Sequence, residues 1–112
     1  MIMSTSAEEL KAFIRRHIAS KTPGLFEILN SFSVKRYGIK ILDLFFTSPE
    51  KLVELLMNYY RDSYTAKFTL QYLFIRPLLV KIKKLDLEEK IVEMLLNDPK
   101  EFKKLLEDLN IV

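Results

Sequence analysis

The sequence predicts an all-α protein, a multihelical bundle of about six to seven short helices in a single domain of residues 1–112. Two observations predict this fold class. The chain has only 2 Gly and 4 Pro among its 112 residues, which is typical of helical proteins and not of β-sandwiches or disordered tails. A segment with helical periodicity also occurs twice, at residues 41–56 and 91–106. We therefore expect two αα-hairpins related by an internal repeat.

Each copy of the repeat has the same order of parts. Apolar residues at i, i+3 and i+4 come first, a Ser-Pro or Asp-Pro pair follows, and a second apolar set at i, i+3, i+4 and i+7 ends the copy. Ser48 and Asp98 are expected to be N-caps. Pro49 and Pro99 follow them at the first helical position, where the missing N–H costs nothing.

The two copies differ on one face. Val53 and Met57 of the first copy correspond to Lys103 and Glu107 of the second. The first hairpin is thus apolar on more sides. We expect it to lie in the core beside the 64–82 segment, with the C-terminal hairpin at the edge.

The N-terminal third is predicted to contain two helices and the start of a third. Ser6 and Glu9 form a capping box that opens the first helix, and Thr22-Pro23 opens a short second one. Residues 30–33 are expected to break that helix. Ser33 is then expected to cap a third helix, which runs to Thr47 with Gly38 inside it.

Residues 64–82 allow two interpretations. Apolar and polar residues alternate between Ala66 and Tyr72, which is the period of a strand, and a β-hairpin would turn near Pro77. That turn lacks the Gly, Asn or Asp of tight hairpins, and the segment is apolar nearly all round. We therefore favour a buried helix, with Pro77 ending, restarting or kinking it.

Two further caps are predicted in the C-terminal third. Asp86 with Glu89 is expected to open a helix over residues 87–96. Asp98 with Glu101 is expected to open the last helix, which ends near Leu109.

The composition offers little material for catalysis. The chain has no Cys and a single His, so a disulfide framework, a zinc cluster, a catalytic thiol and a Ser-His-Asp site are all unsupported. No metal-binding motif or Gly-rich phosphate loop is present. We expect no enzymatic activity, no metal, no cofactor and no small-molecule substrate. His17 is expected to serve as a helix-dipole partner or half-buried filler.

Charge is distributed unevenly along the chain. Residues 33–84 carry ten Lys and Arg against four Asp and Glu, whereas residues 85–112 carry four against eight. The basic middle permits docking on the acidic end, binding of an anionic ligand, or simply a solvated face. Residues 37–80 also loosely resemble a helix-turn-helix, which makes nucleic-acid binding the alternative function. The candidate contacts are Lys67, Arg76, Lys81, Lys83 and Lys84.

The function that we expect first is that of a helical protein–protein interaction module which associates as a homodimer. Such a small, apolar chain tends to bury its excess apolar surface against a partner, and a symmetric dimer is the commonest arrangement. Aromatic residues are the usual interface anchors. The candidates are Phe45, Phe46, Tyr59 and Tyr60, together with Phe32. Without a secretory signal at its N-terminus or a membrane-length apolar run, the chain is expected to be soluble and cytoplasmic.

Overall fold

The computed structural model describes residues 6–109, and every regular element in that range is helical, as predicted. The N-terminal segment on which we base the expectation of no secretory signal includes residues 1–5, which lie outside this range. The elements are α1 (Ala7–Lys21), α2 (Leu25–Tyr37), α3 (Ile41–Thr47), α4 (Pro49–Tyr60), α5 (Ser63–Thr69), the π-helix η1 (Leu70–Ile75), α6 (Arg76–Lys81), the 3₁₀ turn η2 (Leu85–Leu87), α7 (Glu88–Asn97) and α8 (Pro99–Asp108).

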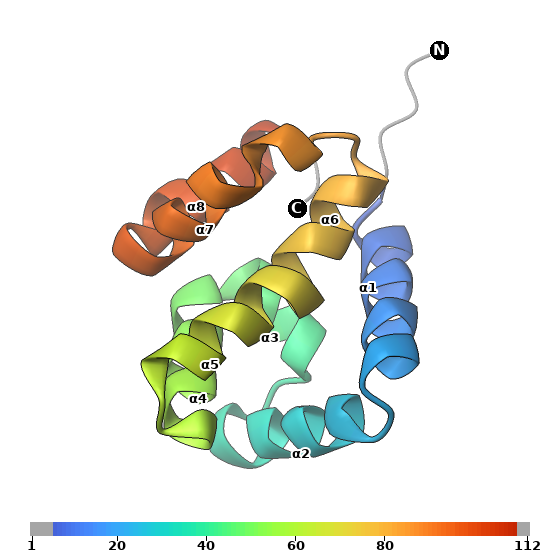
Figure 1. The fold of residues 1–112 in the computed structure, drawn as a ribbon, viewed down its shortest axis with the longest axis vertical. Coiled ribbons are helices and arrows are strands. Elements are labelled where there is room, and N and C mark those ends of the chain that lie inside the picture. Colours follow the sequence, from blue (N-terminus) through green and yellow to red (C-terminus); the bar gives the residue numbers. More distant parts are fainter. Residues whose placement is uncertain (1–5, 110–112) are drawn as a thin grey trace.

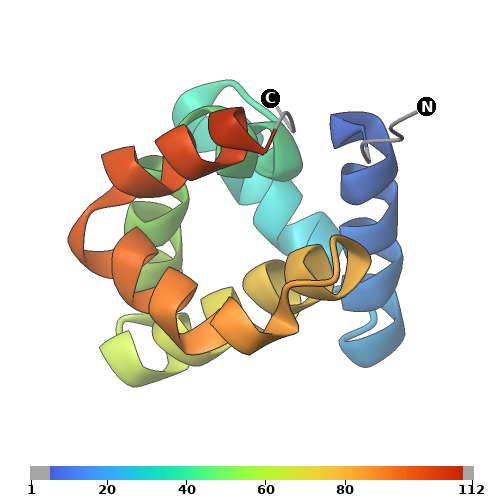
Figure 2. The ribbon, with the colours of Figure 1, turned by 90° about the horizontal axis from the view of Figure 1, so that it is seen from above.

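The helices surround one hydrophobic core. Figure 1 shows α2 lying across one end of the long axis, and Figure 2 shows the helices arranged in a closed ring. Side chains fill the centre of that ring. Phe45 is fully buried there, with its ring centroid 5.1 Å from that of Phe46, 5.6 Å from that of Phe74 and 5.7 Å from that of Phe102. The core thus joins α3, η1 and α8, which are far apart in the sequence.

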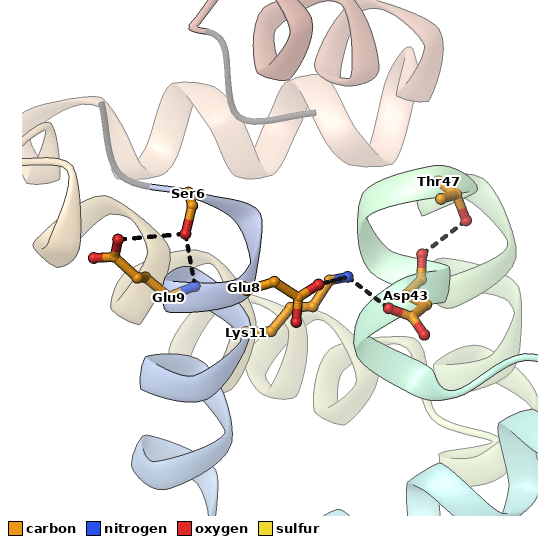
Figure 3. A network of polar contacts seen from close by, with 6 residues as sticks. All are labelled: Ser6, Glu8, Glu9, Lys11, Asp43 and Thr47. Carbon is orange, nitrogen blue, oxygen red and sulfur yellow. Dashed lines mark hydrogen bonds and ion pairs between the residues drawn. The ribbon is translucent and has the colours of Figure 1, made fainter. Parts of the chain in front are cut away.

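The first helix begins where the capping box predicts. The Ser6 hydroxyl accepts a hydrogen bond from the Glu9 N–H at 3.2 Å, as Figure 3 shows. One turn later, Lys11 Nζ lies 3.2 Å from a Glu8 carboxylate oxygen and 2.7 Å from Asp43 Oδ1. The hydrogen bond to Asp43 raises the pKa of Lys11. This lysine therefore links the start of α1 to α3.

The prediction for the second helix was wrong. We expected a break at residues 30–33 and a new helix that contains Gly38. Instead, α2 runs through those residues to Tyr37 and ends at Gly38, whose φ of 74° is left-handed. Glycine adopts this conformation without the steric cost that a Cβ would bring, so it terminates the helix.

The two polar residues that suggested a break stabilise the following turn. Asn30 Oδ1 accepts a hydrogen bond from the Ile41 N–H at 2.8 Å, at the start of α3. The Ser33 hydroxyl, fully buried, donates to the Ile39 carbonyl at 2.6 Å. Asn and Ser are common in turns because they bond backbone groups, and here they do so from inside a helix.

The repeat is confirmed as two αα-hairpins, α3–α4 and α7–α8, with nearly identical turns. Ser48 has φ and ψ of −143° and 68°, and Asp98 has −148° and 73°. The Ser48 N–H donates to the Leu44 carbonyl at 2.8 Å, and the Asp98 N–H donates to the Met94 carbonyl at 2.7 Å. The prediction that their side chains cap the next helix was wrong, since neither makes such a bond. The backbone and the following Pro define the turn instead.

The burial difference between the two hairpins is also confirmed. Val53 and Met57 of α4 are half-buried, whereas Lys103 and Glu107 of α8 are exposed. The second hairpin packs on the first, with α7 and α8 both against α4. The C-terminal hairpin therefore lies at the edge of the bundle, as expected.

Residues 63–81 form one continuous helix, which confirms the helical interpretation of the 64–82 segment. Its middle, η1, is a π-helix in which the Arg76 N–H donates to the Gln71 carbonyl five residues earlier. In this register the next donor, to the Tyr72 carbonyl, would be residue 77, but Pro77 has no N–H. His17 Nε2 of α1 donates to the Tyr72 carbonyl instead, at 3.0 Å.

The predicted capping box of Asp86 and Glu89 was wrong. Residues 85–87 form a 3₁₀ turn, and α7 begins at Glu88 without a side-chain cap. The Glu88 side chain bonds the central helix: its carboxylate accepts hydrogen bonds from Arg76 Nε at 2.6 Å and Nη2 at 2.8 Å, and from Gln71 Nε2 at 2.7 Å. The basic middle and the acidic end are thus joined at this point.

Candidate functional site

An apolar groove between α2 and α4 is the candidate binding site. It has a volume of about 560 Å³. Two of its walls carry exposed apolar side chains, since Ile28 of α2 is 52% exposed and Tyr59 of α4 is 37% exposed. The lining residues are Glu27, Ile28, Ser31, Phe32, Lys35 and Tyr59.

Side-chain contacts hold the two walls of this α2–α4 groove in place. The ring centroids of Phe32 and Tyr59 are 5.8 Å apart, and Tyr60 packs edge-on against Tyr59 at 4.9 Å. Beside them, Arg36 Nη2 donates to Glu54 Oε1 at 3.2 Å. The groove is therefore preformed and lies on two helices that are anchored in the core.

Polar groups lie along one edge of the groove. Glu27 and Lys35 are exposed at its two ends, in the first and last turns of α2, and Ser31 lies between them. Arg36 lies outside the lining; its pKa is raised by hydrogen bonds, first with the Tyr37 hydroxyl and then with Glu54. Chemically, the groove can bury an apolar side chain and pair with one charge of each sign.

The structure separates the predicted interface residues into two groups. Phe45 and Phe46 are buried in the core, so they cannot contact a partner, and we correct their assignment to core residues. They were chosen because aromatic residues anchor interfaces, but aromatic side chains also fill cores. Tyr59 lines the α2–α4 groove, as does Phe32, and the half-buried Tyr60 packs beside them.

The predicted nucleic-acid contacts do not form one surface. Lys67 and Lys81 lie towards opposite ends of the helix over residues 63–81, about 20 Å apart at the usual rise per residue. Arg76 is engaged by Glu88, and Lys81 lies over the Phe13 ring at 5.4 Å.

Lys83 and Lys84 follow the end of α6. Lys83 is exposed with a left-handed φ of 61°, and Lys84 is half-buried. Of the five predicted contacts, only Lys81, Lys83 and Lys84 remain grouped along the chain.

Sequence reasoning missed two exposed apolar surfaces. On α2, Ile28 is 52% exposed and lies on the same side of the helix as the polar Ser31 and Lys35. On α5, Tyr64 is 81% exposed and Phe68 is 55% exposed. The sequence did contain a signal for this surface. The segment is apolar nearly all round, and a small core cannot bury every side of such a helix.

No family model, curated protein or solved structure matches this chain. Among residues 6–109, no three His, Asp or Glu side chains come together as metal ligands do. No helix in the same range is long and apolar enough to cross a bilayer.

Proposed function

We propose that this protein is a helical protein–protein interaction module without enzymatic activity, and that it associates with a second copy of itself through the α2–α4 groove. The observation that carries the proposal is the pair of exposed apolar side chains, Ile28 and Tyr59, on two walls of a preformed groove. Association would remove this apolar surface from water, which is the main driving force for protein–protein binding.

Symmetry allows this site to bind its equivalent on a second copy. The same face of α2 is available on every copy, so one face can bind its equivalent in a closed two-fold dimer. Because Tyr59 already packs on both Phe32 and Tyr60, little side-chain entropy is lost when a partner covers these rings.

The oligomeric state tests the proposal. We expect light scattering after size exclusion to give the mass of a dimer at tens of micromolar. Replacing Ile28 with Glu should shift the protein to monomer, because a charge would then be buried in the contact. Val80→Glu on α6 is the matched control, since Val80 is 46% exposed outside the groove, and it should leave the dimer intact. A monomeric wild-type protein at this concentration would exclude self-association.

Nucleic-acid binding is the second candidate, supported by Lys81, Lys83 and Lys84 at the end of α6. None of the three takes part in an ion pair within residues 6–109. Three lysines supply only a small phosphate-binding surface, so we rank this function below self-association. Titration with duplex and single-stranded DNA and RNA at low salt distinguishes the two.

A further inference from the structure

We propose that the two copies in this dimer cross their α2 helices in antiparallel directions about a two-fold axis at Ser31, so that Glu27 of each copy pairs with Lys35 of the other. The inference rests on the proposed self-association and specifies its geometry. It makes the dimer contact a reciprocal pair of ion pairs that flank a buried apolar patch.

The spacing of the residues on α2 carries the first part of the inference. Glu27, Ser31 and Lys35 follow one another at intervals of four, so they form one ridge along the helix surface. The acid and the base lie at equal distances from Ser31. A two-fold axis requires that if residue i contacts residue j of the second copy, then j also contacts i. An antiparallel pairing of this ridge satisfies that rule, and both contacts then join opposite charges.

A parallel arrangement of the same ridge also satisfies the two-fold rule, but it brings like charges together. Glu27 would then face Glu27 of the second copy, and Lys35 would face Lys35, so that both contacts would be repulsive. The charges therefore select the direction of α2. Helices that pack with their i, i+4 ridges side by side cross at an angle of about 50°, which is the commonest crossing in globular proteins.

The charges at 27 and 35 are available for this pairing. The ion pairs within residues 6–109 join Lys11 to Glu8 and Asp43, Arg36 to Glu54, and Arg76 to Glu88, and they leave Glu27 and Lys35 unused. Arg36, the neighbour of Lys35, is thus already occupied. Between the two charges, the exposed Ser31 has a small side chain that permits close approach at the axis.

The exposed aromatic surface on α5 offers no comparable self-pairing. Lys67 lies beside Tyr64 and Phe68, but the nearby acid, Asp62, caps the helix by accepting hydrogen bonds from the N–H groups of Tyr64 and Thr65. The Asp62 pKa is lowered, first by a hydrogen bond from the Thr65 hydroxyl and then by the Tyr64 N–H. Asp62 and Lys67 are five residues apart, so they do not share an i, i+4 ridge as Glu27, Ser31 and Lys35 do, which favours the α2 face.

Charge reversal tests the geometry. Glu27→Lys alone creates two Lys–Lys contacts in the dimer, and Lys35→Glu alone creates two Glu–Glu contacts. We expect each variant to raise the dimer Kd by about ten-fold or more, measured by sedimentation equilibrium at low salt. The double variant Glu27→Lys with Lys35→Glu restores both pairs in reversed order and should return Kd to near the wild-type value. An equimolar mixture of the two single variants should form the mixed dimer.

The double variant also excludes an effect on folding. Lys at position 27 and Glu at position 35 both oppose the helix dipole and weaken α2. If a weakened α2 caused the loss of dimer affinity, that loss would be greatest in the double variant. Glu93→Lys and Lys90→Glu on the exposed face of α7 control for net charge and should leave Kd unchanged. If the wild type dimerises and no reversal alters Kd, the antiparallel geometry is wrong but self-association stands. A monomeric wild type overturns both.

Discussion

Glu88 shows how one residue can join two parts of the chain. Its side chain is nearly buried at the start of α7, and it accepts two hydrogen bonds from the Arg76 guanidinium and one from Gln71. The guanidinium also lies over the Tyr72 ring at 4.3 Å. The hydrogen bonds from Arg76 lower the pKa of Glu88 below its ordinary value of 4.5, against the opposing effect of burial.

This pair predicts how stability depends on pH. Because the folded state holds Glu88 at a lowered pKa, its contribution is complete above pH 4.5 and is lost as the pH falls through the folded value. Glu88→Gln should lower the free energy of unfolding by about 1–2 kcal/mol at pH 7 and reduce the loss below pH 4.5. Urea unfolding between pH 3 and 7 (about the range in which carboxyl groups titrate) measures both effects.

An unchanged pH dependence in the Gln variant would show that the Arg76 pair contributes nothing. Asp62 also has a lowered pKa, because it accepts a hydrogen bond from the Thr65 hydroxyl. Part of the acid sensitivity should therefore remain in the variant.

At the scale of the element, the π-helix η1 explains the single histidine. In the five-residue register, the backbone donor to the Tyr72 carbonyl would be residue 77, which is Pro and has no N–H. His17 supplies the donor from α1.

A double-mutant cycle tests this relation. His17→Ala should cost about 1 kcal/mol, because it removes the hydrogen bond to the part-buried Tyr72 carbonyl. In the Pro77→Ala background the new N–H at position 77 can bond the Tyr72 carbonyl, so the same change should cost less. Packing losses at position 17 are equal in both backgrounds, and the coupling term therefore isolates the hydrogen bond. Guanidinium unfolding of the four proteins gives the cycle; additive costs would contradict our account.

The helices differ in how well their bounds follow from sequence patterns. Apolar spacing placed both hairpins and the helix over residues 64–82, because burial of one face determines these elements. The end of α2 was missed because Asn30 and Ser33 are residue types that bond backbone groups in loops. Here they make such bonds from within a helix, to the backbone of the next turn. Only the tertiary contact decides between loop and helix.

For the whole molecule, the aromatic cluster around Phe45 connects both copies of the repeat. Phe45→Ala should lower the free energy of unfolding by about 3–5 kcal/mol, a large fraction of the stability of a small domain. Tyr64→Ala removes an aromatic side chain that is 81% exposed, and it should change the free energy of unfolding by less than about 0.5 kcal/mol. Thermal unfolding of the two variants makes the comparison, and similar losses would contradict the core assignment.

The candidate site was less predictable than the fold. Aromatic type alone suggested Phe45 and Tyr59 equally, yet one is buried in the core and the other lines the groove. The groove depends on how far α2 extends and where it lies relative to α4, and neither follows from local periodicity. Likewise, the basic residues at 67, 76 and 81 are near in sequence but are separated by helix geometry and by Glu88.

The position of α2 determines the overall shape of a dimer that is joined through this helix. The helix crosses one end of a molecule that measures 43 Å along its longest axis and about 25 Å across. Two copies joined there would lie end to end and form a rod roughly twice as long as a single molecule. Such a particle meets more friction in solution than a sphere of equal mass, and both of its far ends, with the lysines that follow α6, stay open to water.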